Sequence, residues 1–235
     1  MTNDTTRQVT LQQQSELPLT VKRVGAGRPV LVLHGGHGPS NTAPVVEHFA
    51  PDSLVVQPTH PGWDGTPRPD WFYGIDDLAV TYLDLLEDDD LDDVLVVATS
   101  FGGWIASEMA VRDRAHRITR MVLIDPVGPE VPGYKVEVPE PGDPDAQPSI
   151  MDTVYAYGGP SLRDPKLLRR LARVQVPILM LWGENDTVVS PEFGKVYAAA
   201  FGNARFELLQ NVGHMGLRDA PDVVFALIDS FLAEQ

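Results

Sequence analysis

The stretch of sequence that decides the fold reads Val94-Leu95-Val96-Val97-Ala98-Thr99-Ser100-Phe101-Gly102-Gly103-Trp104. Its first half is a run of apolar residues, which is typical of a strand buried on both faces of a sheet. Its second half opens a helical pattern over 102–112. Ala98 and Gly102, two residues before and after Ser100, are small enough to let the strand and the helix approach across a tight turn. The stretch therefore predicts a strand, a sharp turn that exposes the Ser100 hydroxyl, and a helix.

Outward from this stretch, short apolar runs alternate with helical patterns. Strands are predicted at 30–33, 54–56, 94–97, 121–124, 178–181 and 205–209, with two antiparallel edge strands at 8–14 and 18–24. Helical patterns cover 75–87, 102–112, 191–201 and 221–233. Because strands that alternate with helices imply right-handed crossovers, we predict an α/β fold: a doubly wound, mainly parallel sheet of about eight strands with helices on both faces. Such sheets place their sites at the carboxyl ends of the strands.

One segment, 127–172, breaks this alternation, and eight prolines are interspersed there with glycines and acidic residues. Only short helices fit, at about 148–156 and 164–173, because proline lacks a backbone donor and clashes with the preceding turn. We expect a single domain over 1–235 with a small cap or lid inserted at 127–172. A disordered surface excursion is the alternative for the same segment.

The composition is acidic and argues against several classes of protein. Eighteen basic and 33 acidic side chains give a formal charge of −15, which disfavours binding to nucleic acids and to anionic membranes. The densest acidic run, 87–93, lacks the glycine-centred spacing of a calcium loop, so we interpret it as a solvated helix end and expect no metal. The chain has no cysteine, which excludes disulfides and a thiol nucleophile.

Two further expectations concern location and partners. The polar first twenty residues do not match a signal peptide, and no segment has the roughly 18 apolar residues of a membrane span. A cytoplasmic location is therefore expected. The expected partner is a small-molecule substrate, and the sequence leaves the oligomeric state open.

A serine at a strand-to-helix turn becomes a nucleophile only with a base in reach, and that base needs a third group to fix its tautomer. Of the six histidines, only His214 lies in a glycine-rich loop between a strand-like segment and the last helical pattern. Asp186 follows a buried strand and would lie at the same edge of the sheet as Ser100. Singly, each has an ordinary alternative: a helix N-cap for the serine or the aspartate, and a solvated loop side chain for the histidine.

Together, these motifs resemble the α/β-hydrolase family over nearly the whole chain, from His34-Gly35-Gly36 through Ser100 and Gly183-x-x-Asp186 to Gly213-His214. The order Ser, Asp, His along the chain is the order that this fold requires. The resemblance implies that Ser100 is the nucleophile, that His214 is the general base, and that Asp186 is the acid that orients the histidine.

The resemblance also implies an oxyanion hole. His34-Gly35-Gly36-His37-Gly38 is similar to the family's H-G-G loop, and the donors carried over are the backbone N–H groups of Gly36 and Phe101. His34 and His37 are expected to be structural or rim residues. The chain departs from the family's G-x-S-x-G pattern at Ala98. Asp125 ends another strand at the same edge, where some members place the acid, and it is the rival to Asp186.

The reaction implied is acyl transfer through an acyl-enzyme, with no cofactor. Serine at the turn, in place of aspartate, argues against the family's dehalogenases and epoxide hydrolases. With so short a cap, small or medium neutral esters are the expected substrates, and the negative charge suggests that anionic ones bind poorly. Candidate pocket residues near predicted strand ends, each of which fits core packing equally well, are Trp63, Trp71, Phe72, Trp104, Val188 and Met215.

Two alternatives remain at this stage. The same three residues could serve carbon–carbon bond hydrolysis, thioester hydrolysis or perhydrolysis. From another class, the chain could be a hydrolase-like ligand-binding protein, although three intact candidate residues and a matching oxyanion loop argue against that.

Overall fold

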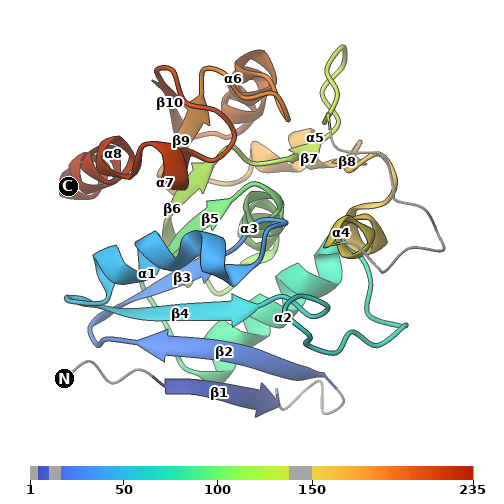
Figure 1. Ribbon diagram of the computed structural model, residues 1–235. Coiled ribbons are helices and arrows are strands. Elements are labelled where there is room, and N and C mark those ends of the chain that lie inside the picture. Colours follow the sequence, from blue (N-terminus) through green and yellow to red (C-terminus); the bar gives the residue numbers. More distant parts are fainter. Residues whose placement is uncertain (1–4, 11–16, 138–149, 235) are drawn as a thin grey trace.

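A computed structural model describes residues 5–10, 17–137 and 150–234, and an eight-stranded sheet forms its centre (Figure 1). In sheet order the strands are β1 (Thr5–Thr10), β2 (Pro18–Val24), β4 (Ser53–Thr59), β3 (Arg28–Leu33), β5 (Val94–Thr99), β6 (Ile118–Ile124), β9 (Ile178–Gly183) and β10 (Ala204–Leu209). The pairs β1–β2 and β2–β4 are antiparallel, and all pairs from β4 to β10 are parallel. The predicted α/β fold with its mainly parallel sheet is confirmed.

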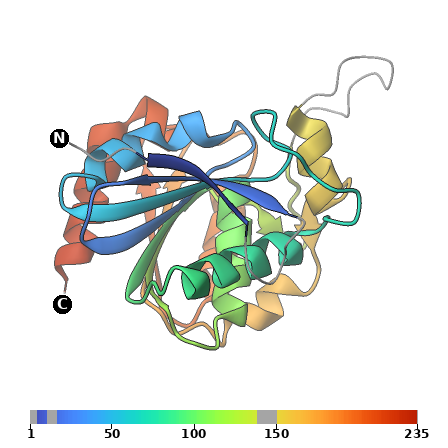
Figure 2. The ribbon, with the colours of Figure 1, turned by 90° about the horizontal axis from the view of Figure 1, so that it is seen from below.

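Helices cover both faces of the sheet. They are α1 (Ala43–Phe49), α2 (Ile75–Asp88), α3 (Phe101–Arg112), α4 (Ile150–Gly158), α5 (Leu167–Leu171), α6 (Pro191–Ala200), α7 (Gly216–Asp219) and α8 (Pro221–Ala233). Figure 2 shows α1 and α8 on one side of the sheet and α2 and α3 on the other. This arrangement buries the two faces in two separate hydrophobic clusters.

Strand β5 illustrates why the sequences of the central strands are unbroken runs of apolar residues. Val94, Val96 and Ala98 belong to the cluster that contains residues of α2 and α3. The residues between them, Leu95 and Val97, belong to the cluster that contains residues of α1 and α8. Successive side chains of a strand point to opposite faces, so a strand covered on both sides has no position for a solvated side chain. The strand ends directly before Ser100, at the carboxyl edge of the sheet.

The structure differs from the sequence-based expectation in several local details. The first strand is β1 at 5–10 rather than 8–14, and 11–14 lies outside the described residues. Helix α1, the preceding 3-10 turn at Pro39–Thr42 and helix α7 were not predicted. Within the described part of the chain, no helix is both long enough and apolar enough to cross a membrane.

The Pro-rich segment between β6 and β9 contains two short helices, as expected, but with other bounds. Helix α4 spans Ile150–Gly158, whereas 148–156 was predicted, and α5 spans only Leu167–Leu171 instead of 164–173. Two short strands, β7 (Gly128–Pro129) and β8 (Arg163–Asp164), pair in parallel and were not foreseen. This pairing joins the two ends of the segment. Part of the predicted cap, 138–149, lies outside the described residues.

Candidate active site

Ser100 occupies the turn between β5 and α3 with φ 50° and ψ −117°. A positive φ is uncommon for a residue with a side chain, and it persists only where the surroundings impose it. Here the Ser100 N–H donates to the carbonyl of Ile124 at 2.9 Å, and the Ser100 carbonyl accepts the Gly103 N–H at 2.9 Å. Ser100 is the N-cap residue of α3, yet its side chain makes no capping hydrogen bond. The Ser100 hydroxyl therefore does not cap the helix, contrary to the N-cap alternative.

The hydroxyl faces His214 instead. The Ser100 Oγ lies 2.9 Å from His214 Nε2, and His214 Nδ1 lies 2.7 Å from Asp186 Oδ2. Only 12% of the His214 side chain is exposed, and the Asp186 side chain is fully buried. Because a carboxylate can only accept, Nδ1 carries the ring proton in this arrangement and Nε2 is left to accept the hydroxyl proton. The three side chains form one continuous row of hydrogen bonds.

The loop after β9 fixes the orientation of the Asp186 carboxylate. Its Oδ1 accepts the backbone N–H groups of Val188 at 2.7 Å and Val189 at 3.0 Å, which leaves Oδ2 for the histidine. Asp186 does not cap the next helix, because Ser190 is the N-cap of α6 and accepts the Phe193 N–H. The capping alternative for Asp186 is therefore excluded.

The loops that carry the acid and the base are packed against each other. A Cβ added to Gly183 would lie 2.3 Å from the carbonyl oxygen of Gly213, so glycine is required for this approach. The Asn185 N–H donates to the Val212 carbonyl at 2.8 Å, and the Glu184 N–H donates to the Leu209 carbonyl at 2.9 Å. These backbone contacts fix the distance between the strand ends that hold Asp186 and His214.

The H-G-G loop lies beside the serine. A Cβ on Gly35 would lie 3.1 Å from the Ser100 Cβ, and a Cβ on Gly36 would lie 3.3 Å from Val154 Cγ2 of α4. The Gly36 carbonyl accepts the indole N–H of Trp63 at 2.9 Å, which fixes the peptide. Phe101 is the first residue of α3, so its N–H has no acceptor within the helix. The predicted oxyanion residues therefore lie on the two segments that flank Ser100.

Two buried histidines, His34 and His60, hold the H-G-G loop in place through hydrogen bonds. His34 Nδ1–H donates to the Gly35 carbonyl, His34 Nε2 accepts the His60 N–H, and His60 Nε2–H donates to the His34 carbonyl. Burial lowers the pKa of His34 to about 4, and the pKa of His60 lies well below its ordinary value for the same reason. Both rings are therefore neutral supports, as expected for His34, whereas His37 is exposed.

Asp125 is buried at the end of β6 but does not take the position of the acid. Its Oδ1 accepts the Gly183 N–H at 2.7 Å, and its Oδ2 has no hydrogen-bond partner among the described residues. Burial raises its pKa well above the usual value, the Gly183 N–H opposes this, and the neighbouring Asp186 charge raises it further. Asp125 thus lies behind the acid loop with a raised pKa, and His214 pairs with Asp186 instead.

The candidate pocket residues separate into three groups. Trp63, Phe72 and Trp104 are buried in the hydrophobic core, as the core-packing alternative holds. Trp71 is 51% exposed, and its ring packs edge-on against Phe72. Val188 and Met215 are half-buried; Val188 lies two residues after Asp186, and Met215 directly follows His214. A role in substrate binding stays a prediction for all six.

Sequence reasoning missed the contribution of α4 to this region. Val154 approaches Gly36, and the Tyr157 hydroxyl donates to the Pro61 carbonyl at 2.9 Å. The Tyr157 ring also stacks on Trp63, with 5.9 Å between ring centroids. The apolar residues Val154 and Tyr157 are three positions apart, a helical spacing, and that signal could have pointed to this face of the helix. Among the described residues, no group of three or more histidine, aspartate or glutamate side chains could hold a metal ion.

Comparisons with known proteins identify the family of the chain. The model of the Alpha/beta hydrolase family matches residues 30–227. A 2-hydroxy-6-oxo-2,4-heptadienoate hydrolase of Pseudomonas putida is 35% identical over 111 residues, which cover 45% of this chain but only 40% of that protein. A poly(3-hydroxyalkanoate) depolymerase of Ectopseudomonas oleovorans is 27% identical over 245 residues, which cover 88% of this chain and 85% of the relative.

Solved structures extend the likeness to the whole fold. The crystal structure of a meta-cleavage product hydrolase superposes with a TM-score of 0.81 at 18% identity, over 97% of this chain and 98% of the other. At that identity the superposition shows the fold alone. Because the family model spans most of the chain, the protein belongs to the alpha/beta hydrolase family.

Proposed function

We propose that this protein is a serine hydrolase that cleaves carboxylic esters of small or medium size through an acyl-enzyme on Ser100. The observation that carries the proposal is the row of hydrogen bonds from the Ser100 hydroxyl through His214 to the buried Asp186, at 2.9 and 2.7 Å. A nucleophile, a base within reach and a group that fixes the tautomer of the base are what acyl transfer to serine requires.

In the first half of the reaction, His214 Nε2 accepts the hydroxyl proton while Ser100 Oγ adds to the ester carbonyl carbon. The carbonyl electron pair moves onto oxygen, and the imidazolium next to Asp186 then gives the proton to the departing alkoxide as the C–O bond breaks. In the second half, His214 takes a proton from water, the hydroxide adds to the acyl carbon, and Ser100 leaves and regains its proton. The products are an alcohol and a carboxylic acid.

The negative charge that develops on the carbonyl oxygen needs fixed donors. The N–H groups proposed for this role are those of Gly36 and Phe101, and loss of one such donor typically costs about 3–4 kcal/mol of transition-state stabilisation. Two features support the assignment: the closeness of the Gly35–Gly36 loop to Ser100, and the place of Phe101 at the start of α3. The buried neutral His34 holds the loop in position without adding a charge.

The segment 127–172 is proposed to act as a cap over this site within a single domain. Supporting contacts come from α4, where Val154 approaches Gly36 and Tyr157 donates to the Pro61 carbonyl. A helix held this close to the oxyanion loop limits the room for the acyl group, which is why we propose small or medium esters. The depolymerase from Ectopseudomonas oleovorans is consistent with hydrolase chemistry in a relative that covers most of this chain.

A second candidate substrate class is a dienoate of the kind named for the Pseudomonas putida relative, cleaved at a carbon–carbon bond by the same three residues. The 35% identity over 111 residues favours this alternative, but the match covers only 40% of that enzyme. Parallel assays with neutral aryl esters and with a 2-hydroxy-6-oxo-dienoate distinguish the two classes.

The decisive experiment is intact-protein mass spectrometry after treatment with a fluorophosphonate, together with hydrolysis of short-chain aryl esters. One adduct, mapped to Ser100, is expected. Ser100→Ala should abolish labelling and reduce kcat by at least about 10⁴-fold. Ser161→Ala changes an exposed serine in the same protein and should retain both properties. A folded protein that takes no adduct and turns over neither substrate class would overturn the proposal.

A further inference from the structure

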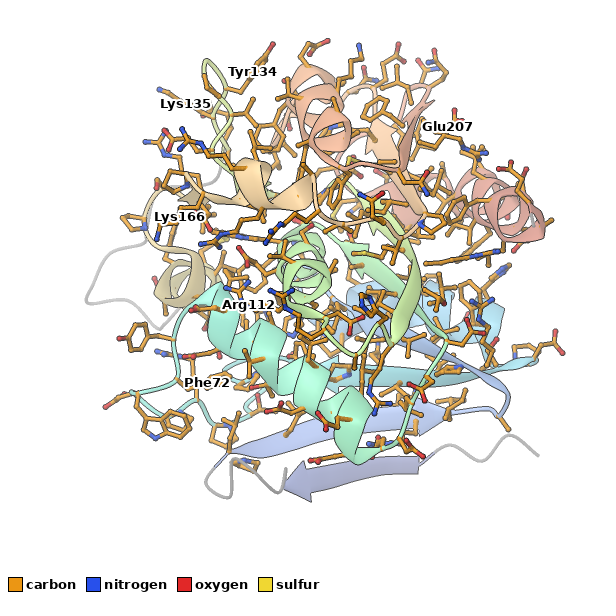
Figure 3. The ribbon with its side chains drawn as sticks, turned by 180° about the vertical axis from the view of Figure 1, so that it is seen from behind. Phe72, Arg112, Tyr134, Lys135, Lys166 and Glu207 are labelled. Carbon is orange, nitrogen blue, oxygen red and sulfur yellow. The ribbon has the colours of Figure 1, made fainter. Side chains whose placement is uncertain are left out.

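The basic residues of this acidic chain are distributed unevenly. Nine of the 18 lysines and arginines lie in two short segments, 112–120 and 163–173. The first segment joins α3 to β6, and the second contains β8 and α5. Figure 3 shows this face of the molecule, where Arg112 and Lys166 are labelled. Half of the cationic side chains in a protein of net charge −15 are thus concentrated around α5 and the end of α3.

Between the two segments lies a groove of about 640 Å³. Its apolar lining comes from Ala110, Val111, Ile118, Val174 and Val176. Its polar lining comes from Asp113, Arg114, His116, Arg169, Arg170, Arg173 and Gln175. Ligand pockets in proteins typically have volumes of roughly 300–1,000 Å³ and combine apolar walls with a few polar groups. In both volume and lining, the groove matches such a pocket.

The charges in the groove are unbalanced. Arg170 pairs with Glu108 at 3.2 Å and Asp164 at 3.5 Å. Within the described part of the chain, Arg114, Arg169 and Arg173 have no ion-pair partner.

The lining contains one carboxylate, that of Asp113. The Asp113 carboxylate already accepts the backbone N–H groups of Arg117 at 3.2 Å and Ile118 at 2.9 Å. Three arginines without an ion-pair partner thus line the groove against one carboxylate, so its lining stays net positive, and an anion bound among the guanidinium groups would reduce their mutual repulsion.

This groove is separate from the candidate active site. Ser100 precedes the first residue of α3, whereas the groove begins at Ala110 near its last turn. With a rise of about 1.5 Å per residue, the helix places them roughly 15 Å apart. The groove also adjoins the start of β6 and the residues just before β9, which are amino ends of parallel strands. The proposed catalytic row lies at the opposite edge of the sheet.

We propose that this groove is a second binding site, which takes a small organic anion with an apolar body. Guanidinium groups form paired hydrogen bonds to carboxylate, sulfonate or phosphate oxygens, and this is the function that the unpaired arginines would serve. The valine and isoleucine side chains supply the surface for the apolar body. The proposal does not depend on the ester hydrolase activity, because none of its residues belongs to the catalytic row.

The test is a fluorescence titration with two dyes of the same shape, the anionic 8-anilinonaphthalene-1-sulfonate and the uncharged N-phenyl-1-naphthylamine. The wild-type protein should bind the sulfonate saturably, and octanoate should displace it whereas octanol should not. The double variant Arg169→Ser/Arg173→Ser should bind it at least about tenfold more weakly, since each lost guanidinium removes a hydrogen bond to a charged group. Binding should also weaken in high salt.

The matched control is Lys195→Ser/Arg218→Ser, which removes two positive charges from exposed positions outside the groove. Its sulfonate affinity should equal that of the wild type, and circular dichroism should show that both variants are folded. Binding to the candidate active site would be the same in all three proteins. Equal affinity of the groove variant and the control would overturn the proposal, as would the absence of saturable binding. An equal loss of the uncharged dye would show that the anion is not what is recognised.

Discussion

Gly102 is the residue on which the close approach of α3 to β3 depends. A Cβ at this position would lie 2.3 Å from the Leu33 carbonyl oxygen and 2.6 Å from that of His34, both backbone atoms that cannot rotate away. Gly102→Ala should therefore lower the free energy of unfolding by about 2–4 kcal/mol, as overpacking in a rigid site does. Urea denaturation measures the loss. Gly213→Ala is the control for stability, because its Cβ would meet only the Asn185 carbonyl at 3.8 Å; equal midpoints for the two variants would contradict the prediction.

Asp125 should make the stability of the protein depend on pH, because burial raises the pKa of this carboxyl group well above its usual value. The folded state then keeps a proton that the unfolded chain releases above about pH 4. Stability from this group is present below that pH and is lost as the pH rises towards the folded-state pKa. Asp125→Asn removes the effect, since an amide is neutral at every pH. As the pH rises from about 4 towards the folded-state pKa, the stability of the variant relative to wild type should rise by up to about 1.4 kcal/mol per pH unit.

The measurement is urea denaturation of both proteins at several pH values. Asp70→Asn changes an exposed aspartate and should keep a constant offset from wild type across the series. A constant offset for Asp125→Asn as well would mean that the Asp125 carboxyl is ionised in the folded protein throughout, contrary to its burial and its unpartnered Oδ2.

For individual residues, the sequence could predict which side chains of the candidate site lie together, but not how deeply each nearby aromatic side chain is buried. Ser100, Asp186 and His214 each follow a strand or strand-like run, so the rule that parallel strands end at one edge places them together. The aromatic residues near strand ends obey no comparable rule. Trp63 is fully buried and Trp71 is half exposed although both follow β4 in the same loop, because the packing of α4 and Tyr157 decides which ring is covered.

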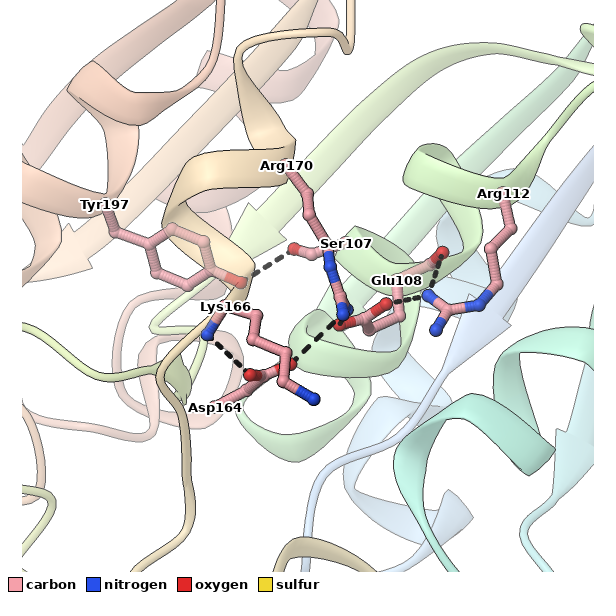
Figure 4. A network of polar contacts seen from close by, with 7 residues as sticks. All are labelled: Ser107, Glu108, Arg112, Asp164, Lys166, Arg170 and Tyr197. Atoms are coloured by element: carbon pink, nitrogen blue, oxygen red, sulfur yellow. Dashed lines mark hydrogen bonds and ion pairs between the residues drawn. The ribbon is translucent and has the colours of Figure 1, made fainter.

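At the scale of elements, a polar network ties α3 to its neighbours (Figure 4). Its members are Ser107, Glu108, Arg112, Asp164, Lys166, Arg170 and Tyr197. Glu108 pairs with Arg112 of its own helix and with Arg170 of α5, and the Tyr197 hydroxyl of α6 donates to Ser107 at 2.7 Å. Since α3 begins directly after Ser100, this network links the helix behind the proposed nucleophile to both the Pro-rich segment and α6.

Glu108→Gln tests how much this link stabilises the fold. The Glu108 side chain is only 3% exposed, so its charge faces Arg112 and Arg170 in a partly dehydrated setting. Because both arginines remain about a third exposed, we expect a loss of about 1–3 kcal/mol, less than for a fully buried pair. Thermal or urea unfolding measures it. Glu192→Gln removes the carboxylate of the exposed pair with Lys195 and should change stability by no more than about 0.5 kcal/mol. A similarly small change for Glu108→Gln would show that the network adds little.

The elements that the sequence predicted best are those with the longest patterns. Helices α2, α3, α6 and α8 carry a sustained helical pattern and were placed within one residue at each end. Helix α1 has only seven residues, and α7 has four, so neither repeats a pattern long enough to identify it. Such short helices depend on tertiary packing: Val45, Val46 and Phe49 of α1 are buried in the same cluster as residues of α8.

At the scale of the whole molecule, the distribution of charge separates the two edges of the sheet. The cationic groove lies at the amino ends of the strands, whereas Asp186 follows the carboxyl end of β9, in the hydrogen-bonded row that reaches Ser100. The three proposed catalytic residues, Ser100, Asp186 and His214, include no lysine or arginine that would reverse the field of the net charge of −15. Anionic ligands that approach the proposed active site should therefore be repelled.

This leads to a prediction about ionic strength. At low salt, kcat/KM for an anionic ester should be several-fold lower than for a neutral ester of the same shape, because the field of the protein lowers the local concentration of anions. Raising the salt from about 0.02 to 0.5 M shortens the Debye length to a few ångströms and should bring the two values together by accelerating only the anionic ester. Initial rates for the matched pair of esters test this. The neutral ester is the control for general salt effects, and an anionic ester that is faster at low salt would show that the site attracts anions instead.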